Sequence, residues 1–395
     1  MADVLLTRDG RPAAALWPAS GFVHLNHGSY GRVPLAAVDH QQRLRQEMEH
    51  GTARFMARAP ERVRRSREEI APFLGVDAQL LALVPNASAG VSTALRSMPL
   101  PAGSEVVVTD HAYGAVRMGV DRAAREAGAA VKVATVPLDA DAETAADAIW
   151  SVVTERTAMI VLDQITSPTA RLLPVGEVCA RARARGIVTV VDGAHAPLLL
   201  TDPVRAAGAD VWVGNLHKFA STPRGTAALV AHEGVADRLR PLIDSWGAPH
   251  PYPHRFDQQG SDDYTAWLTA PMALHHLEDE LGWDRIRAHA TSMAERAVAR
   301  VSEALADTYD DDPAVQVGMP VGPIRLAGLP AAVAVRPDEL RARFIAAGFE
   351  ATFTEHDGRL FWRVSPHAYT TEADLDELIE RGLALLSRAS TAVGG

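Results

Sequence analysis

Short apolar strands alternate with helical segments through the middle of the chain, and this alternation restricts the fold more than any other feature. Between about residues 80 and 231, we predict strands at 105–109, 130–135, 158–162, 188–192, 211–214 and 226–231, and helices at 88–98, 116–127, 141–153 and 175–185. This pattern predicts an α/β fold with a mostly parallel sheet and helices on both faces. Ligands of such sheets bind beyond the carboxyl ends of the strands.

The segments on either side predict a second, smaller unit. Residues 246–263 are rich in Pro, His, Gly and Asp, which indicates a loop leaving the large domain. After it we expect helices at 264–281, 283–306, 337–347 and 371–386, and strands near 322–327, 350–354 and 359–364. The predicted division is an N-terminal loop lining the site at 1–30, a large α/β domain at 31–262 and a small α+β domain at 263–395, packed with the N-terminal segment.

Composition excludes several classes of function. The 395 residues are 47% hydrophobic and 22% charged, as in ordinary globular proteins, and the net charge of −10 argues against a nucleic-acid or anionic-membrane partner. No apolar run approaches the roughly 20 residues of a membrane-spanning helix, and no secretory signal is visible, so a cytoplasmic protein is expected. The single cysteine, Cys179, excludes intramolecular disulfides and Cys-rich zinc sites. No His-Glu-x-x-His motif is present, and no metal is expected.

Only two of the 39 basic Lys and Arg residues are lysines, Lys132 and Lys218. An arginine can replace a solvated ammonium almost anywhere, but it cannot form an imine with a carbonyl. Lys132 lies in an alternating strand pattern that points it to solvent. Lys218 follows the apolar strand at 211–214, where α/β folds assemble their sites. Lys218 is therefore the candidate nucleophile.

Asp192 closes the buried strand at 188–192 and precedes Lys218 by one strand–helix–strand unit. Alone, an aspartate at a strand end is more often a cap of the following turn. Together with the lysine it suits a pyridoxal phosphate (PLP) enzyme, because the carboxylate would keep the pyridine nitrogen protonated and the ring electron-withdrawing. Lys218 would hold the cofactor aldehyde as an imine and act as base at the substrate Cα.

A PLP site also needs a phosphate site and a flat partner for the ring. Residues 85–90 (PNASAG) precede a helix and offer backbone N–H groups and the Ser88 hydroxyl, although an ordinary helix cap explains the same residues. Asn215 and His217 lie close enough in sequence to Lys218 to add donors. His111 or Tyr113, after the strand at 105–109, could stack on the ring, and the sequence does not choose between them.

These features occur in the chain order of a known family. The chain resembles the class V aminotransferase-like PLP enzymes, most closely the isopenicillin N epimerase-like branch, over residues 23–386. The matching stretches are HLNHGSYG at 24–31, DHAYGAV at 110–116, TSPTA at 166–170, DGAHAP at 192–197, GNLHKF at 214–219 and RVSP at 363–366. The resemblance implies the PLP-dependent transferase fold of type I and PLP as cofactor.

The resemblance also implies roles for individual residues. Lys218 corresponds to the Schiff-base lysine, Asp192 to the pyridinium partner, and Arg363 to the arginine that binds the substrate α-carboxylate. The remaining positions are His195 and Ser167 near the cofactor 3′-oxygen, Ala87, Ser88, Asn215 and His217 at the phosphate, Asn26, His27 and Ser29 on the substrate side, and Ser261, which would reach the phosphate of a neighbouring subunit in a homodimer.

Two positions depart from the family pattern. Gln164 stands on the expected substrate side where relatives often have histidine, and a neutral amide cannot shuttle a proton at neutral pH. The related cysteine desulfurases need a nucleophilic cysteine on a mobile loop in the C-terminal half. The only thiol here, Cys179, falls in the predicted helix at 175–185, so persulfide chemistry is not expected.

The expected substrate is a small molecule, an α-amino acid that keeps its carboxylate. Elimination needs only Lys218 as base, whereas epimerisation needs an acid on the opposite ring face. The sequence therefore favours β-elimination (a C–S lyase) from an S-substituted cysteine in secondary metabolism such as antibiotic biosynthesis. The alternatives are an isopenicillin N epimerase-like epimerase, a decarboxylating deaminase of a cysteine conjugate as in lincosamide pathways, and a PLP-binding regulatory protein. An oxidoreductase is disfavoured because no Gly-x-Gly-x-x-Gly follows an early strand.

Overall fold

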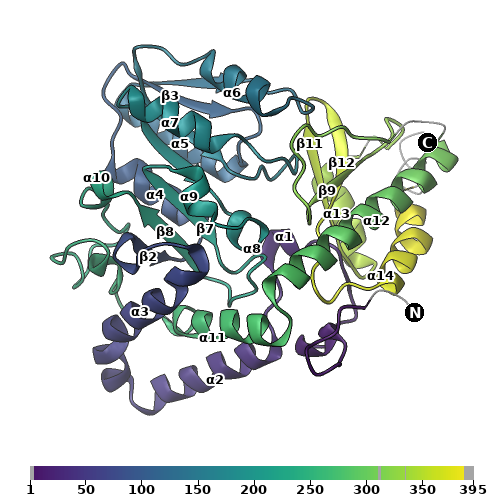
Figure 1. Ribbon diagram of the computed structural model, residues 1–395, viewed down its shortest axis with the longest axis horizontal. Coiled ribbons are helices and arrows are strands. Elements are labelled where there is room, and N and C mark those ends of the chain that lie inside the picture. The colour runs from purple at the N-terminus through teal and green to yellow at the C-terminus, as the bar shows by residue number, and fades with distance from the viewer. Residues whose placement is uncertain (1–3, 310–312, 334, 387–395) are drawn as a thin grey trace.

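The computed structural model describes residues 4–309, 313–333 and 335–386. Figure 1 shows a large body built around one twisted sheet and, beside it, a smaller body that contains the C-terminal strands. Within the described residues, no helix combines the length and apolar character needed to cross a bilayer.

The large sheet has seven strands in the order β2-β8-β7-β6-β5-β3-β4. The strands are β2 (Leu81–Val84), β3 (Glu105–Thr109), β4 (Ala130–Ala134), β5 (Thr157–Asp163), β6 (Val188–Asp192), β7 (Val211–Asn215) and β8 (Ala227–Ala231). Strands β3 to β7 are mutually parallel, and β8 is antiparallel to both of its neighbours. The predicted mostly parallel sheet is confirmed, while β2 had no counterpart in the strands predicted from sequence.

Both faces of this sheet are buried because successive side chains of a strand point to opposite faces. On one face, Val107 and Ile160 share an apolar core with α6 (Ala142–Trp150) and α7 (Val175–Ala184). On the other face, residues such as Val106, Val108 and Val161 pack with α4 (Ala87–Ser97) and α5 (Gly114–Ala127). The helices thus cover the sheet and leave the carboxyl ends of its parallel strands for a site.

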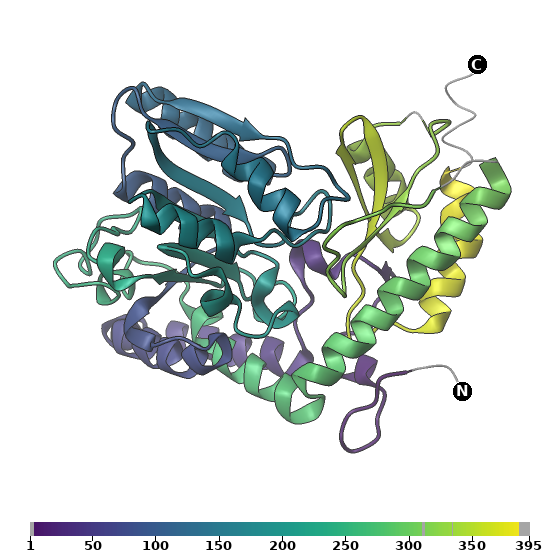
Figure 2. The same cartoon turned by 45° about the horizontal axis from the view of Figure 1, so that its top comes forward.

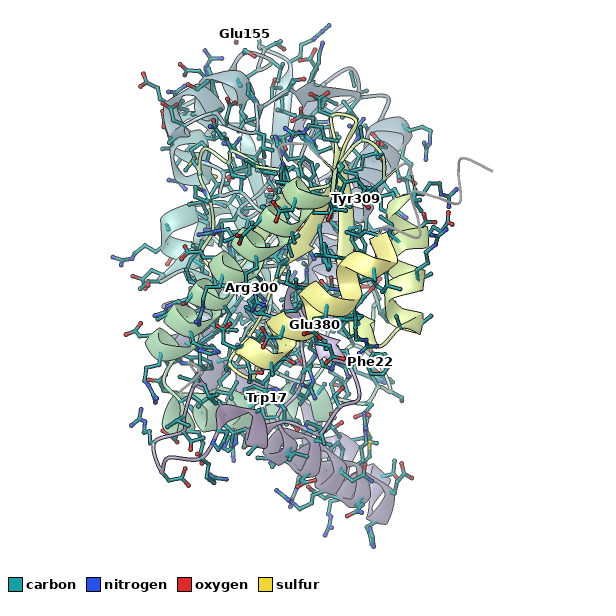
Figure 3. All side chains as sticks on the ribbon, turned by 90° about the vertical axis from the view of Figure 1, so that its right-hand side faces the viewer. Trp17, Phe22, Glu155, Arg300, Tyr309 and Glu380 are labelled. Atoms are coloured by element: carbon teal, nitrogen blue, oxygen red, sulfur yellow. The ribbon has the colours of Figure 1, made fainter. Side chains whose placement is uncertain are left out.

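The smaller body contains an antiparallel sheet in the order β11-β12-β9, formed by β9 (Arg325–Gly328), β11 (Thr352–His356) and β12 (Arg359–Val364). An aromatic core of Phe344, Phe353 and Trp362 joins the sheet to α12 (Trp283–Tyr309), α13 (Pro337–Ala346) and α14 (Glu372–Glu377). In Figure 2 the long α12 runs along this body. Arg300 on α12 pairs with Glu372 and Asp376 of α14, on the side that faces the viewer in Figure 3.

The N-terminal segment connects both bodies. Strand β1 (Val23–His24) pairs in parallel with β10 (Phe349–Glu350) of the smaller body, and the short helix α1 (His27–Tyr30) follows it. Helices α2 (Leu35–His50) and α3 (Thr52–Leu74) then pack against α11 (Thr265–Glu280) below the large sheet (Figure 1). Residues 24–31 therefore pass between the two bodies, at the ends of the central strands.

Candidate active site

A cavity of about 370 Å³ lies at the carboxyl ends of β5, β6 and β7. Its walls include the strand-end residues Asp163, Asp192 and Asn215, the first turn of α4 and the N-terminal segment around Ser29. Cavities of this size are typical of small-molecule sites, and this edge of a parallel sheet is where such sites form.

Lys218 reaches this cavity from the turn that follows β7. Its Nζ lies 3.0 Å from His195 Nε2, and its backbone oxygen accepts a hydrogen bond from His27 Nε2 at 3.0 Å. Burial lowers the pKa of the Lys218 amine to about 7, helped by the positive charge of Arg363 and opposed by Asp192 and Asp163. About half of the amine is thus uncharged at pH 7, in the form that a nucleophile or base needs.

Asp192 lies at the end of β6, where Oδ1 accepts the backbone N–H of Ala194 at 2.9 Å. Asp163 ends the neighbouring strand β5 in register with it, and both carboxyl groups line the cavity. Burial raises the pKa of both groups. Sequence reasoning missed Asp163 because the strand was predicted to end at residue 162. The sequence did contain evidence for it, because Asp163 is a carboxylate at the end of an apolar strand, the feature by which Asp192 was predicted.

The expected phosphate residues Ala87, Ser88, Asn215 and His217 all line the cavity. Asn215 Oδ1 accepts the N–H of Ala87 at 2.8 Å, which holds the start of α4 against the end of β7. Gly90 allows this approach, because a Cβ there would lie 2.4 Å from Val213 Cγ1. The backbone N–H groups and the positive dipole end of α4 make this wall suitable for an anion.

Arg363 on β12 is buried and does not itself line the cavity, but it contacts Ser29 and Ser167, which do. Its Nη1 donates to the Ser167 carbonyl and hydroxyl oxygens at 2.7 and 3.0 Å, and its Nη2 donates to Ser29 Oγ at 3.0 Å. Its Nε has no hydrogen-bond partner among the described residues. Burial lowers the pKa of Arg363 to about 10, so the group stays charged and retains an unused donor. A carboxylate ligand fits this combination.

Asn26 and His27 stand one layer behind Ser29. Asn26 Oδ1 accepts from Ser29 Oγ at 2.7 Å, and His27 Nδ1 lies 2.8 Å from the Tyr369 hydroxyl. Both line a neighbouring cavity of about 360 Å³ instead of the one that holds Lys218. They therefore hold Ser29 and the Lys218 turn in place and do not line the Lys218 cavity themselves.

Gln164 does not line the Lys218 cavity, which corrects its assignment to the substrate side. Its amide nitrogen donates to the Pro203 carbonyl at 2.8 Å, and its amide oxygen accepts from Trp212 Nε1 at 2.8 Å. The reason is the alternation of side chains at the end of β5: Asp163 faces the cavity, so the next residue points to the opposite side.

His111 also lies outside the cavity, which corrects its candidacy for stacking on the cofactor ring. Its ring nitrogens lie 2.7 Å from Thr169 Oγ1 and 2.7 Å from the Val136 carbonyl, and its ring stacks on His356 with centroids 4.2 Å apart. Tyr113, the other candidate for stacking on the ring, lines the cavity and is 43% exposed. Ser261 is exposed and does not contribute to this cavity, so its contact with a neighbouring subunit stays a prediction.

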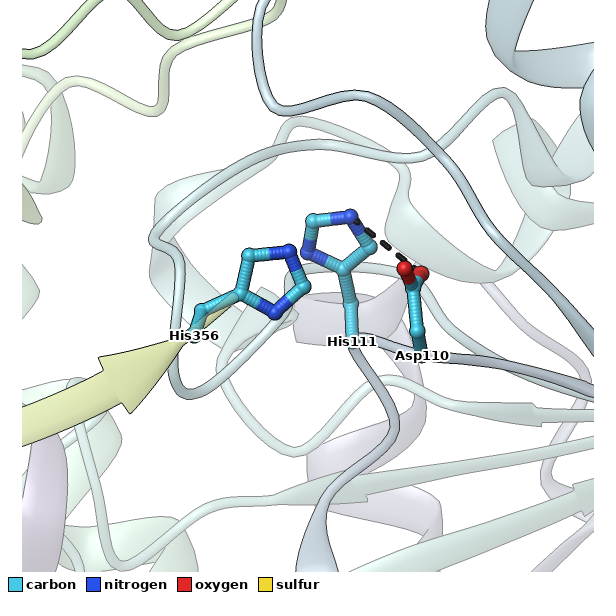
Figure 4. A group of neighbouring side chains, drawn as sticks. All are labelled: Asp110, His111 and His356. Carbon is cyan, nitrogen blue, oxygen red and sulfur yellow. Dashed lines mark ion pairs between the residues drawn. The ribbon is translucent and has the colours of Figure 1, made fainter. Parts of the chain in front are cut away.

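One group among the described residues has the composition of a metal site, formed by Asp110, His111 and His356, whose ligand atoms lie within 4.8 Å of one another (Figure 4). Both ring nitrogens of His111 already contact protein oxygens. A metal ion would have to displace the Thr169 hydroxyl or the Val136 carbonyl, so we assign none here.

Comparison with known proteins identifies the family. The Aminotransferase class-V family profile matches residues 32–316, and the chain belongs to this family. It is 29% identical to isopenicillin N epimerase of Streptomyces clavuligerus over 91% of this chain and 93% of the relative. It is 26% identical to the putative L-cysteine desulfhydrase 1 of Oryza sativa subsp. japonica, over 81% of this chain and 70% of the relative. The cystine C–S lyase C-DES has the same fold, with a TM-score of 0.76 at 17% identity over 92% of this chain and 97% of that one.

The protein is therefore a PLP-dependent enzyme of fold type I, and pyridoxal phosphate is its cofactor. The cavity fits this group, because it combines a buried amine, a buried carboxylate and a helix N-terminus within one enclosed space. When bound, PLP supplies an electron-withdrawing ring that stabilises negative charge at the substrate Cα.

The rate at which the cofactor attaches should depend on pH through the amine of Lys218. Because the pKa of this amine is about 7, its uncharged fraction falls about tenfold for each pH unit below 7 and is nearly constant above 8. We expect the rate of visible-band formation, measured by mixing cofactor-free protein with PLP, to follow this curve. The Lys218→Ala variant, which keeps Lys132, should form no such band. A rate that kept rising towards pH 10 would instead indicate an unperturbed lysine.

Proposed function

We propose that the enzyme removes the Cα proton of an S-substituted cysteine and releases the sulfur substituent by β-elimination. The observation that carries this proposal is that two buried groups occur at one site. The first is the Lys218 amine, whose pKa is about 7, and the second is the Arg363 guanidinium, which is held by Ser29 and Ser167. The arginine would bind the substrate carboxylate and so fix the Cα position, and the amine would accept the proton.

Further residues would hold the cofactor. Lys218 would bind its aldehyde, Asp192 its ring nitrogen, and Ala87, Ser88, Asn215 and His217 its phosphate. Because His195 is buried beside the Lys218 amine, its pKa is held well below the usual value, first by burial and then by the Lys218 charge. A neutral imidazole at this position can hydrogen-bond the amine without repelling it. Tyr113 would cover the exposed face of the ring.

Elimination is favoured over a desulfurase reaction, in which a cysteine of the enzyme takes up the sulfur, because the only thiol of the chain is buried and protonated. Cys179 is buried in α7, and burial raises its pKa to about 11. A thiolate nucleophile is therefore absent at neutral pH. The names of two similar proteins, an L-cysteine desulfhydrase and a cystine C–S lyase, support cleavage at a cysteine sulfur.

Epimerisation is the second candidate, favoured by the 29% identity to isopenicillin N epimerase. It requires a proton donor on the ring face opposite Lys218. Gln164 does not line the cavity, so the presence of an amide at this position is no argument for or against a proton donor in the site. Tyr30 and Tyr113 each bring a hydroxyl group to the cavity wall that could supply it. We further propose that the enzyme works in secondary metabolism as a cytoplasmic homodimer completed by Ser261, consistent with the exposed apolar side chains Ile243 and Trp246.

The reaction can be identified from products formed in deuterium oxide. The holoenzyme is incubated with a set of S-substituted cysteines, and the products are analysed by NMR and mass spectrometry. Elimination predicts release of pyruvate and of the free thiol. Deuterium at Cα with inversion and no pyruvate would contradict the proposal and indicate an epimerase. Release of carbon dioxide would indicate a decarboxylating route.

The Arg363→Ala variant should lose substrate affinity while its cofactor spectrum stays unchanged. Removing a charged hydrogen-bond donor to a carboxylate costs about 1.5–3 kcal/mol, so kcat/KM should fall by about 10- to 150-fold. Arg359→Ala is the matched control, because this arginine is exposed on the same strand and should have no effect on either property. Loss of the cofactor spectrum in Arg363→Ala would mean that this arginine holds the cofactor instead.

A further inference from the structure

The cavity contains a second buried carboxyl group beside the one assigned to the cofactor ring. Asp163 and Asp192 occupy paired positions at the ends of the parallel strands β5 and β6, and their residues are 3% and 2% exposed. Backbones of adjacent strands lie about 4.8 Å apart, so side chains in register on the same face are neighbours. Both side chains line the Lys218 cavity, so they share one face.

Few groups are available to neutralise two negative charges at this position. The backbone of Tyr113 favours the ionised form of Asp163, and the N–H of Ala194 donates to Asp192 Oδ1. Lys218 is the positive group whose charge acts on both carboxylates. The remaining titratable or charged side chains of the cavity wall are Tyr30, Tyr113, His195, His217 and Arg224.

Two buried carboxylates on neighbouring strands repel each other strongly when both are ionised, and sharing one proton relieves the repulsion. Burial raises the pKa of Asp163 well above its usual value, and the charge of Asp192 adds to this. Burial also raises the pKa of Asp192, but by less, since a backbone N–H favours the ionised form of each group and only for Asp163 does the charge of the partner carboxylate add to the rise. Asp163 is therefore the member of the pair that holds the proton.

We infer that Asp163 is a positioning residue that stays un-ionised and donates its O–H to Asp192, so that the pair presents one negative charge to the cofactor ring nitrogen. This inference rests on the proposed role of Asp192 at the ring. Its consequence extends to Lys218, because an ionised Asp163 would favour the ammonium form of that lysine. A neutral Asp163 keeps the amine available as a nucleophile.

Infrared difference spectroscopy tests the protonation directly. The holoenzyme near neutral pH should show the carbonyl band of an un-ionised carboxylic acid, shifted by ¹³C-labelled aspartate and by exchange into deuterium oxide. The band should be missing from the Asp163→Asn variant, whose bound-cofactor spectrum reports that the site is intact. The absence of such a band in the wild-type protein, or its persistence in Asp163→Asn, would overturn the inference. The wild-type measurement decides even if the variant does not fold.

A second measurement uses the cofactor-free protein and so does not depend on the chemistry of Lys218. A carboxyl group whose pKa is raised on folding contributes stability below its unfolded pKa of about 4, and this stability is lost as the pH rises. Asparagine has no proton to lose. The folding equilibrium constant of Asp163→Asn relative to wild type should therefore increase with pH above about 4, by up to about tenfold per unit.

A purely structural Asp163 that is ionised in the folded protein would give a ratio that does not change with pH above about 4, and this result would overturn the inference. Failure of the proposed function would have a different signature. In that case the product analysis in deuterium oxide would show no pyruvate, while the infrared band of the holoenzyme and the pH-dependent ratio of the cofactor-free protein would remain.

Discussion

Burial of ionisable groups at the carboxyl ends of β5, β6 and β7 is the constraint on which the site depends. Parallel strands that are covered by helices on both faces bring their last residues into one enclosed space. Asp163, Asp192 and Lys218 occupy this space, and each has its pKa shifted towards the uncharged form, primarily by burial. The same desolvation therefore makes the lysine amine nucleophilic and leaves two carboxyl groups that can share a proton.

The N-terminal segment fixes the position of the Lys218 turn. His27 donates to the Lys218 carbonyl, and Gly31 approaches so closely that a Cβ there would lie 2.0 Å from the His217 carbonyl oxygen. Two residues later than His27, Ser29 accepts from Arg363 of the smaller body. One short segment thus links the turn that carries the amine to the arginine that would bind the substrate carboxylate. The distance between amine and arginine is set by this segment rather than by either body alone.

The sequence predicted those parts of the site that depend on local pattern. Lys218 and Asp192 were recognisable because an arginine-rich chain keeps a lysine after one apolar strand and a carboxylate at the end of another. Asp163 was not predicted as a site residue because the predicted strand ended one residue too early. Gln164 was assigned to the site wrongly, because successive side chains of a strand point to opposite faces and its neighbour Asp163 faces the cavity. The packing of His111 between Thr169, Val136 and His356, and the antiparallel direction of β8, depend on tertiary contacts that no local pattern specifies.

The central claim is that a single amine, that of Lys218, forms the covalent link to pyridoxal phosphate. Reduction of the holoenzyme with borohydride, followed by digestion and mass spectrometry, tests it most directly, because the chain offers only one other lysine side chain. Our account predicts the reduced cofactor on the peptide that contains Lys218 and none on the peptide that contains Lys132. Recovery of the cofactor on Lys132, or on no peptide at all, would contradict it.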